Sequence, residues 1–406
     1  MADTAGPAYR RSARRPDRGY ARDVPPTRAR IATSGVFALN GFLLGMWIVN
    51  IPTIKDRTGV DQADLGLMLL VLGGMAWIGM QLSGPAVDRF GSRPVAILAT
   101  IALAATLPGP GFATSGGQLV AALAVVGFFN GFIDVAQNAQ AVVVEREYRR
   151  PIMSAFHAFY SLGALLASIL GGGLIALGVD VRTTLVVAAV IGVAAAAGVR
   201  PFLIPAPAPV EDAPAKGRAP WTSKVLLLGL LAFSLLLAEG VAYDWSTIHL
   251  RDSLGSSETI AAVAYGAFSA AMTIVRLLAD RVVAAWGPAV YVSRAALVGA
   301  LGLLGAALAP DAGLAIVAWA VFGVGLAGCV PQFFSAAGNV DPAASGTYLA
   351  RVTSMGYVGL LAGPSVIGLL THWIPLTTAF ALPIVGCLAA GLLAPRALAP
   401  APKERA

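Results

Sequence analysis

Charged residues divide this chain into long apolar stretches, and their spacing limits what the chain can fold into. The stretch between Arg30 and Lys55 holds 24 uncharged residues, and the one between Asp64 and Asp88 holds 23. A helix of about 20 apolar residues crosses the hydrocarbon core of a bilayer. The chain is 57% apolar and 12% charged, whereas soluble domains have roughly 45–50% and about 25%. These proportions exclude a soluble enzyme and predict a membrane protein.

Twelve helical spans account for the apolar stretches. Where an uncharged stretch is too long for one span, a turn rich in proline and glycine divides it, as at residues 108–111. The predicted spans are 31–54, 65–87, 94–110, 117–144, 151–178, 183–203, 224–248, 259–279, 289–309, 313–336, 347–370 and 375–395. We therefore expect an all-α membrane protein with twelve transmembrane helices.

The segment between the sixth and seventh spans has a different composition. Residues 204–223 hold five prolines with four charged residues between them, which cannot pack in lipid. This linker separates two predicted six-helix halves, 31–203 and 224–396. Residues 1–30 are expected to form a disordered basic tail on the cytoplasmic side, and residues 397–406 a second cytoplasmic tail.

Lysine and arginine are distributed unevenly between the two sets of loops. With a cytoplasmic N-terminus, the cytoplasmic segments hold 23 of these residues and the opposite loops hold 4. Because cytoplasmic loops carry the basic excess, both termini are predicted to lie on the cytoplasmic side, and the membrane is predicted to be a bacterial inner membrane. Eight arginines precede the first span, where anionic lipids of the inner leaflet are the expected partner. The net charge of +7 therefore does not indicate nucleic acid.

Few residues suit a metal or a cofactor. The two cysteines, Cys329 and Cys387, lie in apolar stretches, and the three histidines are too far apart for a familiar metal-binding spacing. The sequence contains no phosphate-binding loop of the type G-x-x-x-x-G-K-[ST]. We expect a monomer that uses no cofactor, no metal and no direct ATP hydrolysis.

The two halves repeat one another. Asp88 and Arg89 follow the second span, Asp280 and Arg281 follow the eighth, and 192 residues separate each residue from its counterpart. The first and seventh spans begin near residues 32 and 224, which is the same offset. Repeated halves in a membrane protein are typical of transporters.

The loop after the second span resembles the signature of the major facilitator superfamily, G-x-L-a-D-r-x-G-r-k. The matching residues are Gly84, Asp88, Arg89, Gly91 and Arg93. Ala86 and Ser92 replace the usual Leu and Arg. The stretch from Asn130 to Gly163 resembles a narrower group, the YbjJ-like inner-membrane proteins, distant relatives of fucose permease. The resemblance implies the twelve-helix fold, a rocking mechanism and proton coupling, but no particular substrate.

The signature loop also has a physical interpretation as a gate. Gly84 and Gly91 permit a tight turn and a close approach of helices. Asp88 is predicted to lie at the N-terminal end of another helix, near the start of the eleventh span, where the helix dipole stabilises an anion. Together these contacts would hold the cytoplasmic side closed.

Basic residues are expected to complete the gate through ion pairs. Arg89 or Arg93 would pair with Glu145 or Glu147 at the end of the fourth span. The alternative is that this loop carries only a turn aspartate and the basic residues that set the topology.

Arg276 lies inside the eighth span, one turn before the Asp280–Arg281 pair. A salt bridge of the gate is therefore favoured for Arg276, and an anionic substrate is the alternative. The candidate gating residues of the second half are Arg276, Asp280 and Arg281.

Polar residues are concentrated in every third span. Spans 3, 6, 9 and 12 hold almost none, so they are predicted to face lipid, whereas spans 1, 4, 7 and 10 are predicted to line a shared interior. The candidate solute-binding residues are Asn40, Trp47, Asn50, Asn130, Gln137, Asn138, Tyr243 and Gln332, with Tyr357 from span 11. An outer interfacial aromatic is an equally good interpretation of Trp47. The polar face of span 4 has the alternative of a hydrogen-bond cluster without a transport role.

Asp134 is the first candidate for proton coupling, because it is an acid in the middle of span 4. Asn130, Gln137 and Asn138 share its helical face and can hydrogen-bond either protonation state. Burial favours the neutral form of a carboxyl group, so such an acid can exchange protons near cellular pH. Glu239 is the competing candidate, and both acids could titrate in sequence.

These features favour a secondary active transporter that moves a small polar, sugar-like solute together with protons by alternating access. Proton-driven efflux is the runner-up, although span 5 lacks the Gly-Pro pattern expected of antiporters. A non-transporting sensor on a transporter fold is a further alternative. A membrane enzyme is disfavoured, because the sequence offers no paired carboxylates and no nucleophile with a base.

Overall fold

The structure is a computed structural model that describes residues 24–60, 62–205 and 219–399. The predicted tail up to residue 23, linker residues 206–218 and residues 400–406 lie outside the described part. The helices of the first half are α1 (Pro26–Thr58), α2 (Gln62–Phe90), α3 (Ser92–Thr106), α4 (Pro108–Phe112), α5 (Gly116–Tyr148), α6 (Met153–Ala176) and α7 (Val181–Val199), followed by η1 (Arg200–Phe202). Those of the second half are α8 (Ser223–Ile248), η2 (His249–Ser253), α9 (Glu258–Trp286), α10 (Pro288–Leu308), α11 (Ala312–Leu326), α12 (Cys329–Gly338), η3 (Pro342–Ala344), α13 (Ser345–Leu370), α14 (Leu376–Ala379) and α15 (Ala381–Ala397).

The helices match the predicted spans in number. Among the described residues, eleven helical segments are long and apolar enough to cross a membrane. The remaining long helix is α9, which contains Arg276, Asp280 and Arg281. The prediction of an all-α membrane protein with twelve transmembrane helices is therefore confirmed.

Short polar side chains begin several of these helices. The Ser115 hydroxyl accepts a hydrogen bond from the Gln118 amide at the start of α5, and Thr222 does the same for Val225 at the start of α8. These caps satisfy amides that have no partner within the first turn of a helix. They fix the ends of the two helices that carry the buried acids.

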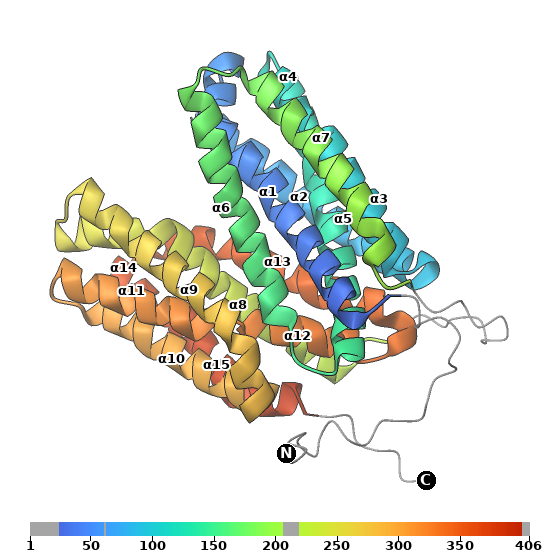
Figure 1. The fold of residues 1–406 in the computed structure, drawn as a ribbon. Helices are drawn as coiled ribbons and strands as arrows, with labels where there is room; N and C mark the ends of the chain where they lie inside the picture. The colour runs from blue at the N-terminus through green and yellow to red at the C-terminus, as the bar shows by residue number, and fades with distance from the viewer. Residues whose placement is uncertain (1–23, 61, 206–218, 400–406) are drawn as a thin grey trace, which may run out of the picture.

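The helices form two bundles that meet at one end of the molecule (Figure 1). Helices α1–α7 make up one bundle and α8–α15 the other. The bundles are in contact at the end where α1 begins and α15 ends, called the terminal end below, and they diverge toward the opposite end. Gly84 permits one of these contacts, because a Cβ atom there would lie 2.8 Å from the Gly346 carbonyl oxygen of α13.

Three of the predicted spans differ in detail from the helices observed. The first helix begins at Pro26, not at residue 31, because proline suits the first helical position, where an amide has no partner. Arg28 and Arg30 therefore lie on α1, and the Arg30 guanidinium donates to the Tyr148 hydroxyl at 3.2 Å. The tenth span is divided into α11 and α12 at Gly328, whose φ of 73° interrupts a helix. The third span is likewise divided, into α3 and α4.

The repeat has one irregularity at the terminal end. Gly91 and Gly287 follow α2 and α9 with φ values of 85° and 80°, and they are 196 residues apart. This offset exceeds the 192 residues between Asp88 and Asp280 by four, which is about one helical turn. Asp280 therefore lies about one turn deeper in its helix than Asp88.

Candidate functional site

Asp88 joins the two bundles at the terminal end. Its carboxylate accepts hydrogen bonds from the amides of Gly346 at 2.7 Å and Thr347 at 2.9 Å. It also accepts one from the Thr347 hydroxyl at 2.5 Å. These donors are the first turn of α13, so the predicted contact of Asp88 with the start of this helix is confirmed.

Asp280 makes the equivalent contact in the reverse direction. Its two carboxylate oxygens accept from the amides of Ser154 at 3.0 Å and Ala155 at 2.7 Å, in the first turn of α6. The helices that receive the two acids begin at residues 153 and 345, which are 192 apart. Each bundle therefore places one aspartate on a helix N-terminus of the other. We call these two contacts the aspartate latches.

Glu145 and Arg146 add further contacts at the same end. Glu145 accepts from the amides of Ile152 at 2.9 Å and Met153 at 3.0 Å, and from the Ser335 hydroxyl of α12. The Arg146 Nε donates to the Asn339 side-chain oxygen at 2.6 Å, and its guanidinium also donates to the Gly338 carbonyl. Within the described residues, Glu145 forms no ion pair with an arginine.

The predicted pairing of Arg89 or Arg93 with Glu145 or Glu147 is not formed among the described residues. The α6 amides and Ser335 already use both oxygens of Glu145. The Arg89 guanidinium instead lies 5.1 Å from the centre of the Phe90 ring.

Arg276 belongs to the interior and not to the gate, which corrects a second prediction. Its guanidinium lies 3.2 Å from the Glu239 carboxylate of α8, and both side chains are largely buried. The Tyr243 hydroxyl donates to the same Glu239 oxygen. The Arg276 Nε atom is buried without a hydrogen-bond partner among the described residues. Arg276 is one turn from Asp280, but the α6 amides occupy that carboxylate.

Asp134 is held very differently. It is 5% exposed, and one of its oxygens accepts a long hydrogen bond of 3.4 Å from Gln137. The other oxygen is buried and has no hydrogen-bond partner in the described structure. The Tyr357 hydroxyl of α13 lies close to the Asp134 carboxyl, and the Tyr160 hydroxyl of α6 lies within electrostatic range of it.

These side chains form one group that both bundles share, which we call the central cluster. It consists of Asp134, Tyr160, Glu239, Tyr243, Arg276 and Tyr357. The sequence analysis missed Tyr160, whose hydroxyl lies within electrostatic range of Asp134, Glu239 and Arg276. The sequence did contain a signal for Tyr160, because it follows His157 by three residues and so shares its face of α6. A single tyrosine in an apolar helix is, however, weak evidence for a functional site. Spans 5, 8 and 11 thus contribute as well as spans 4 and 7.

The amides on α5 surround Asp134 in different ways. Asn138 donates to the Asp134 carbonyl at 2.8 Å, and its side-chain oxygen lies 3.1 Å from the His157 ring. Gln137 keeps a buried oxygen without a partner among the described residues. Asn130 and Tyr357 line a cavity of about 480 Å³ between α2, α5 and α13.

Four other predicted solute-binding residues have other surroundings. Asn50 donates to the Met46 carbonyl of its own helix at 2.7 Å. Gln332 donates to the Ser154 hydroxyl at the terminal end. Trp47 is buried in an apolar cluster of the first bundle, so its interpretation as an interfacial aromatic was wrong. Asn40 is buried, with a side-chain oxygen that has no partner among the described residues.

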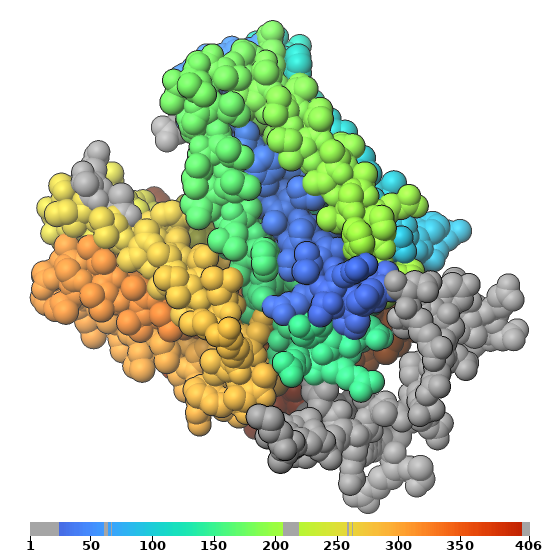
Figure 2. Space-filling model, viewed as in Figure 1, coloured from blue at the N-terminus to red at the C-terminus, as the bar shows by residue number. Residues whose placement is uncertain are grey.

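The space between the bundles is open at the end opposite the termini. Figure 2 shows the surface hollowed there between α6 and α9. Tyr243 and Tyr265 remain 39% and 43% exposed, and their ring centres are 5.9 Å apart. The Tyr243 hydroxyl contacts Glu239, so this exposed pair of rings is joined to the buried ion pair. The part of the chain that the structure describes contains no group of three metal-ligating side chains.

Comparisons with known proteins agree with this architecture. A family model described as Major Facilitator Superfamily matches residues 33–348 and 245–406. An uncharacterised MFS-type transporter of Yersinia pestis is 32% identical over 373 residues, which cover 91% of this chain and 94% of the relative. An uncharacterised transporter of Sinorhizobium fredii is 34% identical over 365 residues, covering 88% and 95%.

Solved structures share the fold at low sequence identity. The fucose:proton symporter FucP of E. coli is 15% identical, with a TM-score of 0.72 over 90% of this chain and 98% of that one. A structure of FucP in the outward conformation gives a TM-score of 0.76 with the same identity and coverage.

Proposed function

Because this chain belongs to the major facilitator superfamily and is a multi-pass membrane transporter, we propose that it moves a small polar solute together with protons by alternating access. One observation carries the proposal. Asp134 is a buried acid with an oxygen that has no partner in the described structure, and it shares a cluster with an ion pair from the other bundle.

Asp134 is the proposed coupling site. An uncompensated carboxylate in a low-dielectric interior is costly, and binding a proton removes that cost. Glu239 is less suited, because protonating it would leave Arg276 without its counter-ion. The hydroxyls of Tyr160 and Tyr357 lie within electrostatic range of both Asp134 and Glu239. A change of charge on Asp134 in the first bundle would therefore be felt by the ion pair in the second bundle.

The orphaned acceptors of α5 suggest the chemistry of the solute. One buried side-chain oxygen of Asp134 and one of Gln137 form no well-aligned hydrogen bond within the described residues, although the Tyr357 hydroxyl lies close to the Asp134 carboxyl. A neutral solute that carries several hydroxyl groups supplies hydrogen-bond donors, as a sugar or a polyol does. A related fold serves fucose:proton symport in E. coli, which supports this class of solute.

The aspartate latches are the proposed gate. They join the two bundles at the terminal end while the bundles diverge at the opposite end, which supports one of the two states that alternating access requires. We assign the terminal end to the cytoplasm of a bacterium from the distribution of basic residues. The state described is then outward-facing, and the N-terminal arginines face the anionic inner leaflet.

The test begins by finding the solute. Thermal unfolding of the purified protein is screened against a library of neutral polyols and sugars, with amino acids and organic anions as the comparison set. Hits are tested for uptake into liposomes under an inward proton gradient. Accumulation that a protonophore abolishes supports symport. Accumulation driven by an outward gradient supports efflux, and binding without flux supports a sensor; either result contradicts the proposal.

A further inference from the structure

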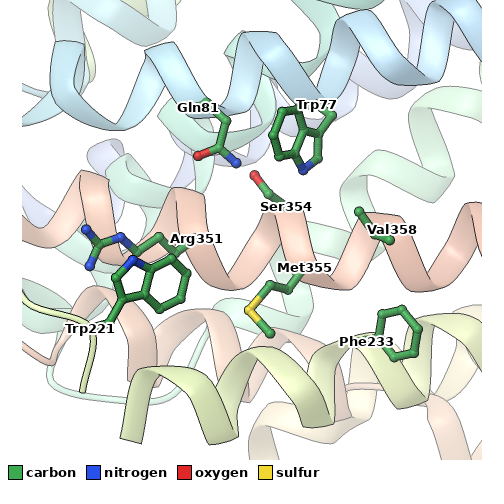
Figure 3. Close-up of a pocket in the computed structure, with 8 residues that line it drawn as sticks. All are labelled: Trp77, Gln81, Trp221, Phe233, Arg351, Ser354, Met355 and Val358. Carbon is green, nitrogen blue, oxygen red and sulfur yellow. The ribbon is translucent and has the colours of Figure 1, made fainter. Parts of the chain in front are cut away.

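A groove on the side of the molecule lies between α2, α8 and α13, and it shares Trp77 and Val358 with the cavity that Asn130 and Tyr357 line. Its volume is about 460 Å³, and its lining residues are Trp77, Gln81, Trp221, Phe233, Arg351, Ser354, Met355 and Val358. Figure 3 shows Arg351 and Trp221 at one end and Val358 and Phe233 at the other. The groove is therefore polar at one end and apolar at the other. Trp77 and Trp221 are 43% and 60% exposed, so it opens on the outer surface of the bundles.

The floor of the groove holds a polar atom without a partner. Ser354 is 2% exposed, and its hydroxyl makes no hydrogen bond within the described residues. In Figure 3 this hydroxyl points between the side chains of Trp77 and Gln81. A buried hydroxyl without a partner is unfavourable, so an acceptor on a ligand in this groove would satisfy it.

Arg351 is held rigidly at the polar end. Its guanidinium donates to the carbonyls of Ala219 at 2.9 Å and Pro220 at 3.1 Å, and it lies 4.5 Å from the centre of the Trp221 ring. A guanidinium has five N–H groups, so these two bonds leave donors for an anion. Phosphate is an anion that arginine binds well because of its fork of donors.

The groove also has the right depth for a lipid. Trp221 immediately precedes α8, and Arg351 lies in the second turn of α13, so both are at the terminal end of membrane-spanning helices. Ser354 and Val358 follow Arg351 by three and seven residues on one face of α13, about 4.5 and 10.5 Å further along the helix axis. A phosphate, an ester and an acyl chain follow one another in the same order in a phospholipid.

We propose that this groove is a binding site for one phospholipid of the leaflet at the terminal end. The lipid phosphate contacts the Arg351 guanidinium, and an ester carbonyl accepts the Ser354 hydroxyl. An acyl chain lies along Trp77, Phe233 and Val358. Because α2 belongs to one bundle and α8 and α13 to the other, the bound lipid joins the bundles in the state with a closed terminal end.

The test measures lipid binding to the purified full chain by native mass spectrometry. Delipidated protein is titrated with phosphatidylglycerol, with glycerol 3-phosphate as the headgroup alone and diacylglycerol as the chains alone. We expect saturable binding of one phosphatidylglycerol, at least tenfold weaker in Arg351→Met and at least threefold weaker in Ser354→Ala. The two partial ligands should bind far more weakly than the whole lipid.

Arg294→Met is the matched control. Arg294 also lies against a tryptophan, 4.7 Å from the centre of the Trp286 ring, but it does not line the groove. Its substitution should leave the affinity for phosphatidylglycerol unchanged. Ser354→Ala removes one unpartnered hydroxyl and nothing else, so it keeps the test valid if Arg351→Met does not fold. Equal affinity in Ser354→Ala and wild type would overturn the proposal, as would equal binding of either partial ligand.

Discussion

Each bundle buries one carboxylic acid in the central cluster, and the two acids have opposite surroundings. Glu239 contacts Arg276 at 3.2 Å and accepts a hydrogen bond from Tyr243. Asp134 has one long hydrogen bond and an oxygen without a partner in the described structure. The difference separates two tasks. In the function we propose, the second bundle holds a fixed charge pair, and the first holds the acid whose charge changes.

The same contrast gives the largest predicted effect. Arg276→Met leaves Glu239 buried without its counter-ion, and breaking a buried ion pair in this way costs about 3–5 kcal/mol. We expect the free energy of unfolding in detergent to fall by that amount, which a lower unfolding temperature would report. The double variant Arg276→Met with Glu239→Gln should recover most of it, because no charge is left unpaired. If Arg276→Met were as stable as the wild type, Glu239 and Arg276 would not form a permanent buried ion pair.

The aspartate latches offer a second comparison, between a buried and a more exposed carboxylate. Asp280 is buried, whereas Asp88 is only partly buried. Hydrogen bonds to a charged group contribute about 1.5–3 kcal/mol when they are shielded from water. We expect Asp280→Asn to shift the equilibrium toward an open terminal end by this amount, and Asp88→Asn by about 1 kcal/mol.

Cysteine accessibility from the terminal side measures both shifts. Ala141→Cys on α5 is buried in the closed state and should react faster in each latch variant, most in Asp280→Asn. Ala188→Cys, buried inside the first bundle, is the control and should stay protected. Cys329 and Cys387 are buried, so the background reaction is low. An unchanged rate at position 141 would mean that the latches do not hold the end closed.

The sequence predicted the helices better than the contacts between them. The spacing of charged residues located all twelve long helical segments, because the cost of polar backbone in lipid leaves little choice of structure. The contact of Asp88 with α13 was also predicted correctly, because the amides at a helix N-terminus are the partners that a carboxylate in such a loop favours. Arg276 was misassigned because Asp280 is near in sequence, whereas Glu239 is near only in space. Tyr160 was missed for the same reason: nothing in an apolar helix indicates which face meets the other bundle.

The smallest predicted effect concerns Tyr160. If its hydroxyl links Asp134 to the ion pair, Tyr160→Phe removes one hydrogen-bonding group, which contributes about 0.5–1.5 kcal/mol. We expect solute accumulation driven by a proton gradient to slow by roughly two- to tenfold, with expression unchanged. Tyr148→Phe removes a hydroxyl at the terminal end and is the control. If both variants slow transport equally, the position of Tyr160 in the central cluster has no special importance.

The most direct test of the account is solute transport by Asp134→Asn in liposomes. Asparagine mimics the protonated acid with little change in volume, so exchange of labelled solute across the membrane should persist. Accumulation of the solute against its own concentration gradient should disappear in the variant. In the wild type, a membrane potential of 100 mV supplies about 2.3 kcal/mol per proton, which can sustain roughly a 50-fold concentration ratio of solute. If Asp134→Asn still concentrates the solute, Asp134 is not the coupling site, and Glu239 becomes the acid to examine.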